Sequence, residues 1–136
     1  MEKAGLEVSV LYVDDEDQSR EALARLLRFR GLAVRTAGHG KDALRMFRDE
    51  RPHIIVTDLM MPEMDGLEMS REIRRICAEI PIIVTSAHLQ EKFVVDLKVL
   101  GVSHFIQKPV RLERLMNSIE TCCLEAGILI RPDSSQ

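Results

Sequence analysis

The chain has 136 residues, of which 46% are hydrophobic and 30% are charged. This length suits one domain, and the composition is that of a folded globular protein rather than of a disordered one. The formal net charge of −3 gives no overall attraction to nucleic acid or anionic lipid, and no apolar run approaches the roughly 18 residues that a membrane span requires. We therefore expect a cytoplasmic protein that binds no nucleic acid directly and does not enter a membrane.

Short apolar runs alternate along the chain with longer segments whose apolar residues recur at helical spacing. The predicted strands are residues 8–13, 32–37, 53–57, 82–85 and 102–107. The predicted helices are residues 17–30, 40–50, 66–77, 90–100 and 111–125. We expect Asp17 to cap the first helix, because an acidic side chain there can accept hydrogen bonds from the first turn.

Continuous apolar strands joined by helices indicate a parallel sheet covered on both faces. Five such units predict an α/β fold with a single doubly wound five-stranded parallel sheet and five helices, in flavodoxin-like order. We divide the chain into an N-terminal extension at 1–7, one domain at 8–125 and a C-terminal tail at 126–136. The tail is too short for a second domain, and we expect it to fray unless residues 128–130 pack on a neighbour.

The three cysteines, Cys77, Cys122 and Cys123, include no CxxC pair. An odd number of cysteines without metal-ligand spacing predicts buried or half-buried thiols of a reducing compartment. A disulfide framework or a zinc site is therefore not expected.

Polar side chains follow the predicted strands where each strand ends. Asp14 and Asp15 follow the first strand, Asp58 the third, Ser86 the fourth and Lys108 the fifth. We expect these side chains to gather, because ligands of open α/β sheets bind beyond the carboxyl ends of the strands. Three carboxylates form a hard-oxygen site that suits Mg²⁺, and a hydroxyl and an ammonium beside them suit the oxygens of a phosphoryl group.

Four segments carry a resemblance to a known family: V-D-D at 13–15, I-V-T-D-L-M-M-P-E-M-D-G at 55–66, S-A at 86–87 and G-V-S-H-F-I-Q-K-P at 101–109. Over residues 8–125 the chain resembles the receiver domain of two-component response regulators. The resemblance implies a phosphoprotein of a phosphorelay. It would take a phosphoryl group from a histidine kinase or phosphotransfer protein and signal to an output domain or protein.

The resemblance also assigns roles to the residues at the strand ends. It implies that Asp58 is the phosphoacceptor and that Asp14, Asp15, Asp58 and the backbone carbonyl of Met60 hold Mg²⁺. Lys108 would pair with the phosphoryl group and be followed by a cis peptide bond to Pro109.

The same resemblance implies a switch made of Ser86 and Phe105. Ser86 would turn inward to the phosphoryl group and Phe105 would follow it, which changes the surface of the fourth helix, fifth strand and fifth helix. Thr85 is the alternative to Ser86, and the family position favours Ser86. Met60 and His88 occupy positions that modulate hydrolysis in receivers, although His88 is equally well explained as a solvent-exposed loop residue.

Two other functions compete with this interpretation. A phosphorylation-independent interaction module of the same fold would be favoured by an incomplete acid set, but the set here is complete. A Mg²⁺-dependent phosphatase with an aspartate nucleophile would carry a general acid two residues later, where this chain has Met60. We therefore expect a signalling receiver rather than a turnover enzyme, one that catalyses only its own phosphorylation and dephosphorylation. A homodimer through the fourth-helix face is left open.

Overall fold

The computed structural model of the protein describes residues 7–128. Its strands are β1 (Ser9–Val13), β2 (Ala33–Ala37), β3 (Ile54–Asp58), β4 (Ile82–Ser86) and β5 (His104–Gln107). They form one sheet in the order β2-β1-β3-β4-β5, and every neighbouring pair is parallel. The predicted flavodoxin-like sheet is confirmed.

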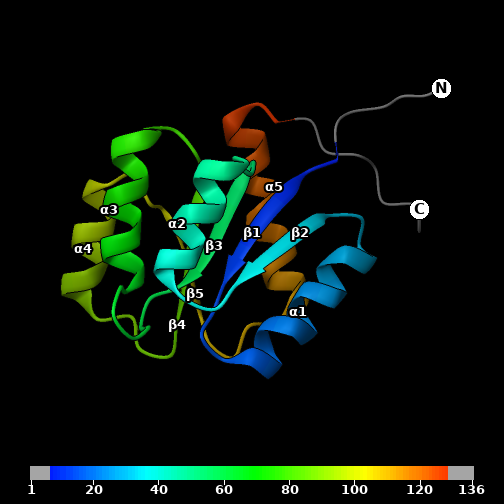
Figure 1. The fold of residues 1–136 in the computed structure, drawn as a ribbon, viewed down its shortest axis with the longest axis horizontal. Coiled ribbons are helices and arrows are strands. Elements are labelled where there is room, and N and C mark those ends of the chain that lie inside the picture. The colour runs from blue at the N-terminus through cyan, green and yellow to red at the C-terminus, as the bar shows by residue number, and fades with distance from the viewer. Residues whose placement is uncertain (1–6, 129–136) are drawn as a thin grey trace.

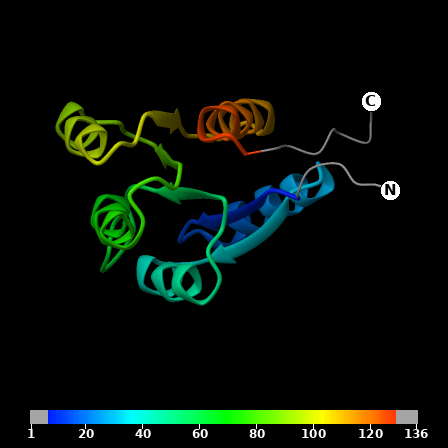
Figure 2. The same ribbon diagram turned by 90° about the horizontal axis from the view of Figure 1, so that it is seen from above.

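The helices are α1 (Asp17–Phe29), α2 (Gly40–Asp49), α3 (Gly66–Ile76), α4 (Glu91–Val99) and α5 (Leu112–Ala126). Helices α1 and α5 cover one face of the sheet, and α2, α3 and α4 cover the other (Figure 1, Figure 2). Every predicted element is present. None of the described helices is long and apolar enough to cross a membrane.

Each strand divides its side chains between two buried layers, because successive residues of a strand point to opposite faces. In β1, Leu11 and Val13 pack in the layer beneath α2, α3 and α4, whereas Val10 and Tyr12 pack in the layer beneath α1 and α5. This alternation fixes which side chains lie near each helix at the carboxyl end of the sheet, where the polar residues gather.

One detail of α1 differs from the prediction. The residue that caps α1 is Glu16, which makes no side-chain cap hydrogen bond, and Asp17 is the first residue of the helix itself. The expectation that Asp17 caps the helix is therefore wrong. Leu26 is 45% exposed, because the inward face of α1 is centred on Ala24 and Leu27, which are both 0% exposed.

The C-terminal end of α5 is closed by Gly127, whose φ of 73° is left-handed. The Ile128 N–H donates to the Cys123 carbonyl at 2.8 Å, a hydrogen bond that folds the chain back over the last turn. Ile128 packs against the core beneath α1 and α5, and the rest of the predicted tail lies outside the described residues. Cys122 and Cys123 are buried and Cys77 is half-buried, and all three are free thiols as expected.

Candidate functional site

Three carboxylates meet at the carboxyl ends of β1 and β3. Asp14 is 1% exposed and Asp58 is 5% exposed, whereas Asp15 lies open to solvent. One oxygen of each of these three side chains lies within 4.8 Å of the others. The register of the sheet explains this proximity, since β1 and β3 are neighbouring parallel strands and end at the same edge.

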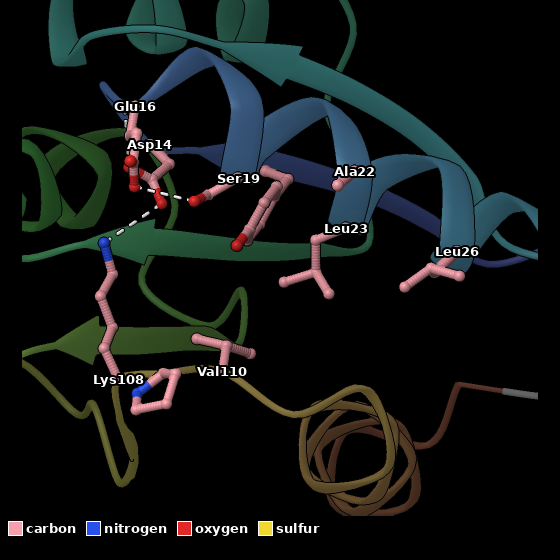
Figure 3. Close-up of a pocket in the computed structure, with 10 residues that line it drawn as sticks. Asp14, Glu16, Ser19, Ala22, Leu23, Leu26, Lys108 and Val110 are labelled. Atoms are coloured by element: carbon pink, nitrogen blue, oxygen red, sulfur yellow. Dashed lines mark hydrogen bonds and ion pairs between the residues drawn. The ribbon is translucent and has the colours of Figure 1, made fainter.

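Lys108 reaches the same carboxylates from the end of β5. Its Nζ donates to Asp58 Oδ2 at 2.8 Å and to Asp14 Oδ2 at 3.2 Å (the latter contact is drawn in Figure 3). The Lys108 N–H donates to the Ser86 carbonyl at 2.8 Å, which fixes the residue at the edge of β4. The Lys108–Pro109 peptide bond is cis, as the resemblance implied.

The charges of the site perturb one another. Burial raises the pKa of Asp58, the ion pair with Lys108 lowers it in part, and Asp14 and Asp15 raise it again, so the net direction is upward. Burial lowers the pKa of Lys108, but the hydrogen bonds and charges of Asp58 and Asp14 outweigh burial and raise it overall. One lysine therefore does not neutralise the three carboxylates.

This donor set fits a divalent cation. Mg²⁺ prefers oxygen ligands and is commonly held by one or two carboxylates together with water and phosphate. The carboxylates of Asp14, Asp15 and Asp58 offer oxygens within mutual reach. A cation bound among them would offset the repulsion that raises the pKa of Asp58.

Ser86 is fully buried at the end of β4, and its hydroxyl is held by the loop that follows. The Ser86 Oγ donates to the His88 carbonyl at 2.9 Å and accepts from the His88 N–H at 3.1 Å. The neighbouring Thr85 Oγ1 is sealed from solvent and has no hydrogen-bond partner among the described residues. His88 contributes these backbone groups while the residue itself is exposed.

Phe105 and Met60 are two further residues with predicted roles in the site. Phe105, in β5, is half-buried and packs against the core beneath α2, α3 and α4. Met60 follows Asp58 by two residues and is 58% exposed. Neither side chain forms a hydrogen bond or an ion pair with the carboxylates, so their assigned roles stay predictions.

Hydrogen bonds hold the loop from Asp58 to α3 in its middle and at the start of α3. At the start of α3, Asp65 accepts from the Glu68 N–H at 2.8 Å and Glu68 accepts from the Asp65 N–H at 3.1 Å, a reciprocal capping box. In the middle of the loop, Glu63 has a φ of 68°, and the Met64 N–H donates to the Pro62 carbonyl at 2.7 Å across it. This tight turn sets the path of the backbone beside the phosphoacceptor candidate.

Sequence reasoning missed two residues that shape the site. Arg20 of α1 donates from Nη1 to the Asp14 carbonyl at 2.9 Å and so anchors the loop that carries the acidic pair. Tyr12, 1% exposed, lies two residues before Asp14 and lines a pocket beside it. The apolar run around Tyr12 marked it only as a strand residue, and the many arginines of α1 gave no signal that singled out Arg20.

Comparison with known proteins agrees with this geometry. Residues 10–120 match the response regulator receiver domain. The chain belongs to the family of response regulator receiver domains. Two relatives of this receiver domain are the response regulators MprA of Mycobacterium tuberculosis (strain H37Rv) and of Mycobacterium leprae (strain TN). The protein from M. tuberculosis is 38% identical over 111 residues, which are 82% of this chain and 48% of that protein. The protein from M. leprae is 38% identical over 110 residues, which are 81% of this chain and 48% of that protein.

Solved structures show the same fold. A response regulator receiver protein from Pseudomonas putida is 34% identical, with a TM-score of 0.78 over 85% of this chain and 98% of that protein. A CheY-like receiver domain protein from Methanospirillum hungatei JF-1 has a TM-score of 0.86 over 90% of this chain and 98% of that protein, at 21% identity. This receiver domain spans about half the length of the MprA relatives.

Proposed function

We propose that this receiver domain accepts a phosphoryl group on Asp58. The observation that carries the proposal is the Asp58 carboxylate, 5% exposed and 2.8 Å from Lys108 Nζ, beside two further acids. A carboxylate oxygen of Asp58 attacks the phosphorus of a phosphohistidine, the new O–P bond forms as the N–P bond breaks, and the histidine nitrogen leaves. The donor is a histidine kinase or a phosphotransfer protein.

In this proposal Asp14, Asp15, Asp58 and the Met60 carbonyl hold Mg²⁺. The bound cation would supply positive charge against the phosphoryl oxygens. After transfer, Lys108 pairs with the phosphoryl oxygens and so exchanges the Asp58 carboxylate for the phosphoryl group as its anionic partner. The domain thereby catalyses only its own phosphorylation and hydrolysis, and Met60 and His88 modulate the access of water in this proposal.

The switch follows from new contacts that exist only after phosphorylation. We propose that the Ser86 hydroxyl leaves its hydrogen bonds to His88 and donates to the phosphoryl group, and that Phe105 turns into the space this opens. Ser86 ends β4, and Phe105 lies in the neighbouring strand β5, where it packs in the layer beneath α2, α3 and α4. Because these contacts form in only one of two conformations, they shift the equilibrium of the surface of α4, β5 and α5 toward that conformation. The changed surface signals to an output domain or protein and is available for a homodimer.

The receiver unit is proposed to cover residues 8–125, with 1–7 and 126–136 as flanking segments. The match over residues 10–120 supports this division, and α5 continues to Ala126, one residue beyond the proposed boundary. Since the MprA relatives are about twice as long, the output element belongs either to further sequence or to a separate protein.

Intact mass spectrometry after incubation with acetyl phosphate and Mg²⁺ tests the proposal, with Asp58→Asn and Asp15→Asn treated in parallel. We expect the wild type to gain one phosphoryl group and lose it on standing, Asp58→Asn to gain none, and Asp15→Asn to gain it more slowly. Wild-type protein that gains nothing from acetyl phosphate or from a phosphorylated kinase would favour the alternative, an interaction module that works without phosphorylation. Label on Asp58→Asn would place the acceptor elsewhere.

A further inference from the structure

A pocket of about 530 Å³ lies beside the carboxylates, between α1 and the segment that joins β5 to α5. Its apolar wall is made by residues of both segments: Ala22, Leu23, Leu26, Pro109 and Val110. In Figure 3, Leu23 and Leu26 project from α1 into the space that faces Val110. Its polar end is made by Asp14, Glu16, Ser19 and Lys108. Its volume falls within the range of small-molecule sites in proteins, roughly 300–1,000 Å³.

A buried tyrosine, Tyr12, is part of the lining of this pocket. Tyr12 is 1% exposed, and no residue among those described hydrogen-bonds to its hydroxyl. The polar side-chain atoms that are both sealed and without a partner in the described chain are Ser70 Oγ and Thr85 Oγ1. The Tyr12 hydroxyl is therefore not sealed, and the small exposure of Tyr12 includes the hydroxyl at the pocket wall. A buried tyrosine normally satisfies its hydroxyl with a hydrogen bond.

The charge of the lining indicates what chemistry the pocket accepts. Glu16 and Asp14 are acidic, and the one cation, Lys108, is already paired with Asp14 and Asp58. Glu16 accepts from the Ser19 hydroxyl at 2.7 Å, so Ser19 is not free to bind an anion. An anionic ligand would meet net negative charge at this end, whereas an uncharged molecule would not.

We infer that this pocket binds a small uncharged amphipathic molecule, whose apolar body packs between α1 and Val110 and whose carbonyl oxygen accepts a hydrogen bond from Tyr12. The inference goes beyond phosphorylation, because it needs neither Mg²⁺ nor a phosphoryl group. It does place the ligand next to Lys108, whose Nζ contacts Asp58 at 2.8 Å.

Ligand-observed ¹⁹F NMR with 4-fluoroacetophenone tests the inference on the full chain. This probe carries an aromatic body and one carbonyl acceptor, and 4-fluorotoluene offers a similar body without the acceptor. We expect saturable binding of the ketone, weakened about tenfold by Tyr12→Phe, which removes one hydrogen bond and keeps the ring. Binding of 4-fluorotoluene should not change in that variant, and 4-fluorobenzoate should bind less tightly than the ketone.

Two further variants separate the pocket from the rest of the surface. Ala22→Leu fills the pocket from an exposed helical position and should abolish binding of the ketone, whereas Ala126→Leu makes the same change at an exposed site on α5 and should leave binding intact. Asp58→Asn should bind the probe like the wild type, so loss of phosphorylation and loss of this site are distinguishable. Absence of saturable binding to the wild type, or equal binding to the wild type and Ala22→Leu, would overturn the inference.

Discussion

Gly66 lies directly against the backbone of Asp58. A Cβ atom at Gly66 would stand 2.5 Å from the Asp58 carbonyl oxygen and 3.0 Å from Leu59 Cα, closer than real Cβ contacts allow. The Gly66 N–H also donates to the Leu59 carbonyl at 2.8 Å. The first residue of α3 is thus packed against the strand end that carries the phosphoacceptor candidate.

Gly66→Ala should therefore destabilise the domain and displace Asp58. The obstructing atoms belong to the backbone and cannot rotate away, so we expect a loss of about 1–3 kcal/mol in the free energy of unfolding. Urea denaturation measures the loss, and acetyl phosphate labelling should slow in the same variant. Gly38→Ala is the comparison variant, because its Cβ would approach side-chain atoms of Arg20, at 3.2 Å from Nη1, rather than backbone atoms. Equal stability of the two variants would contradict the packing argument.

Asp58→Asn should stabilise the domain when metal is chelated. The pKa of Asp58 is raised in the folded protein, first by burial, so the folded state binds this proton more tightly than the unfolded chain does. The stability that Asp58 contributes is full below its unfolded pKa of about 3.9 and is lost as pH rises through the raised folded value. At pH 7 the ionised carboxylate is therefore a cost, which the neutral isostere removes.

Urea midpoints in EDTA at pH 4 and pH 7 measure this effect. We expect the free energy of unfolding of Asp58→Asn to exceed that of the wild type by about 1 kcal/mol at pH 7, the size of a typical single-substitution effect. The difference in this free energy should be smaller at pH 4. Added Mg²⁺ should narrow the gap, because an ion that binds the folded wild type stabilises it by mass action. A variant less stable than the wild type at pH 7 in EDTA would show that the ion pair with Lys108 outweighs burial and repulsion.

The fold and the cluster of carboxylates at the strand ends could be predicted because they depend on local sequence patterns. Each strand is a short apolar run, and each of Asp14, Asp58 and Lys108 directly follows one, so the parallel topology brings them together without further information. The capping box of Asp65 and Glu68 could also be predicted from the sequence. A side chain that accepts hydrogen bonds, followed three residues later by a glutamate, marks the start of a helix.

Other features depend on packing that the sequence does not encode locally. Glutamate has no preference for the left-handed φ of 68° that Glu63 adopts, and the turn is imposed by the loop between Asp58 and α3. The exposure of Leu26 depends on which turn of α1 faces the sheet. The pocket at Tyr12 depends on the spacing between α1 and the chain after β5, which neither segment specifies alone.

Lys108→Met should weaken the domain in EDTA by leaving Asp58 and Asp14 without their cation. We expect a loss of about 1–2 kcal/mol at pH 7, below the 3–5 kcal/mol of fully buried pairs because the Lys108 side chain is 25% exposed. The pKa of Lys108 is raised, so its contribution is full below its unfolded pKa of about 10.4 and is lost as pH rises through the higher folded value.

The difference between wild type and Lys108→Met should thus stay constant from pH 7 to about 10 and shrink above it. Urea midpoints across that range, read by circular dichroism, follow the difference. Lys92→Met is the control, since Lys92 is exposed and lies over the Phe93 ring, away from the carboxylates. A difference that shrinks already between pH 7 and 9 would assign the effect to another group.

The three thiols should differ in reactivity although two of them are adjacent. Burial raises the pKa of Cys122 to about 12 and also raises that of Cys123, whereas Cys77 is only half-buried near the end of α3. Because the thiolate is the nucleophile, a raised pKa and a closed surface both slow alkylation. Iodoacetamide at pH 8 should add first to Cys77, seen as one adduct by intact mass and located by peptide mapping. The same reagent in urea should add to all three cysteines. Labelling of Cys122 in the native protein at the same rate as Cys77 would instead mean that α5 opens from the sheet faster than the reagent reacts.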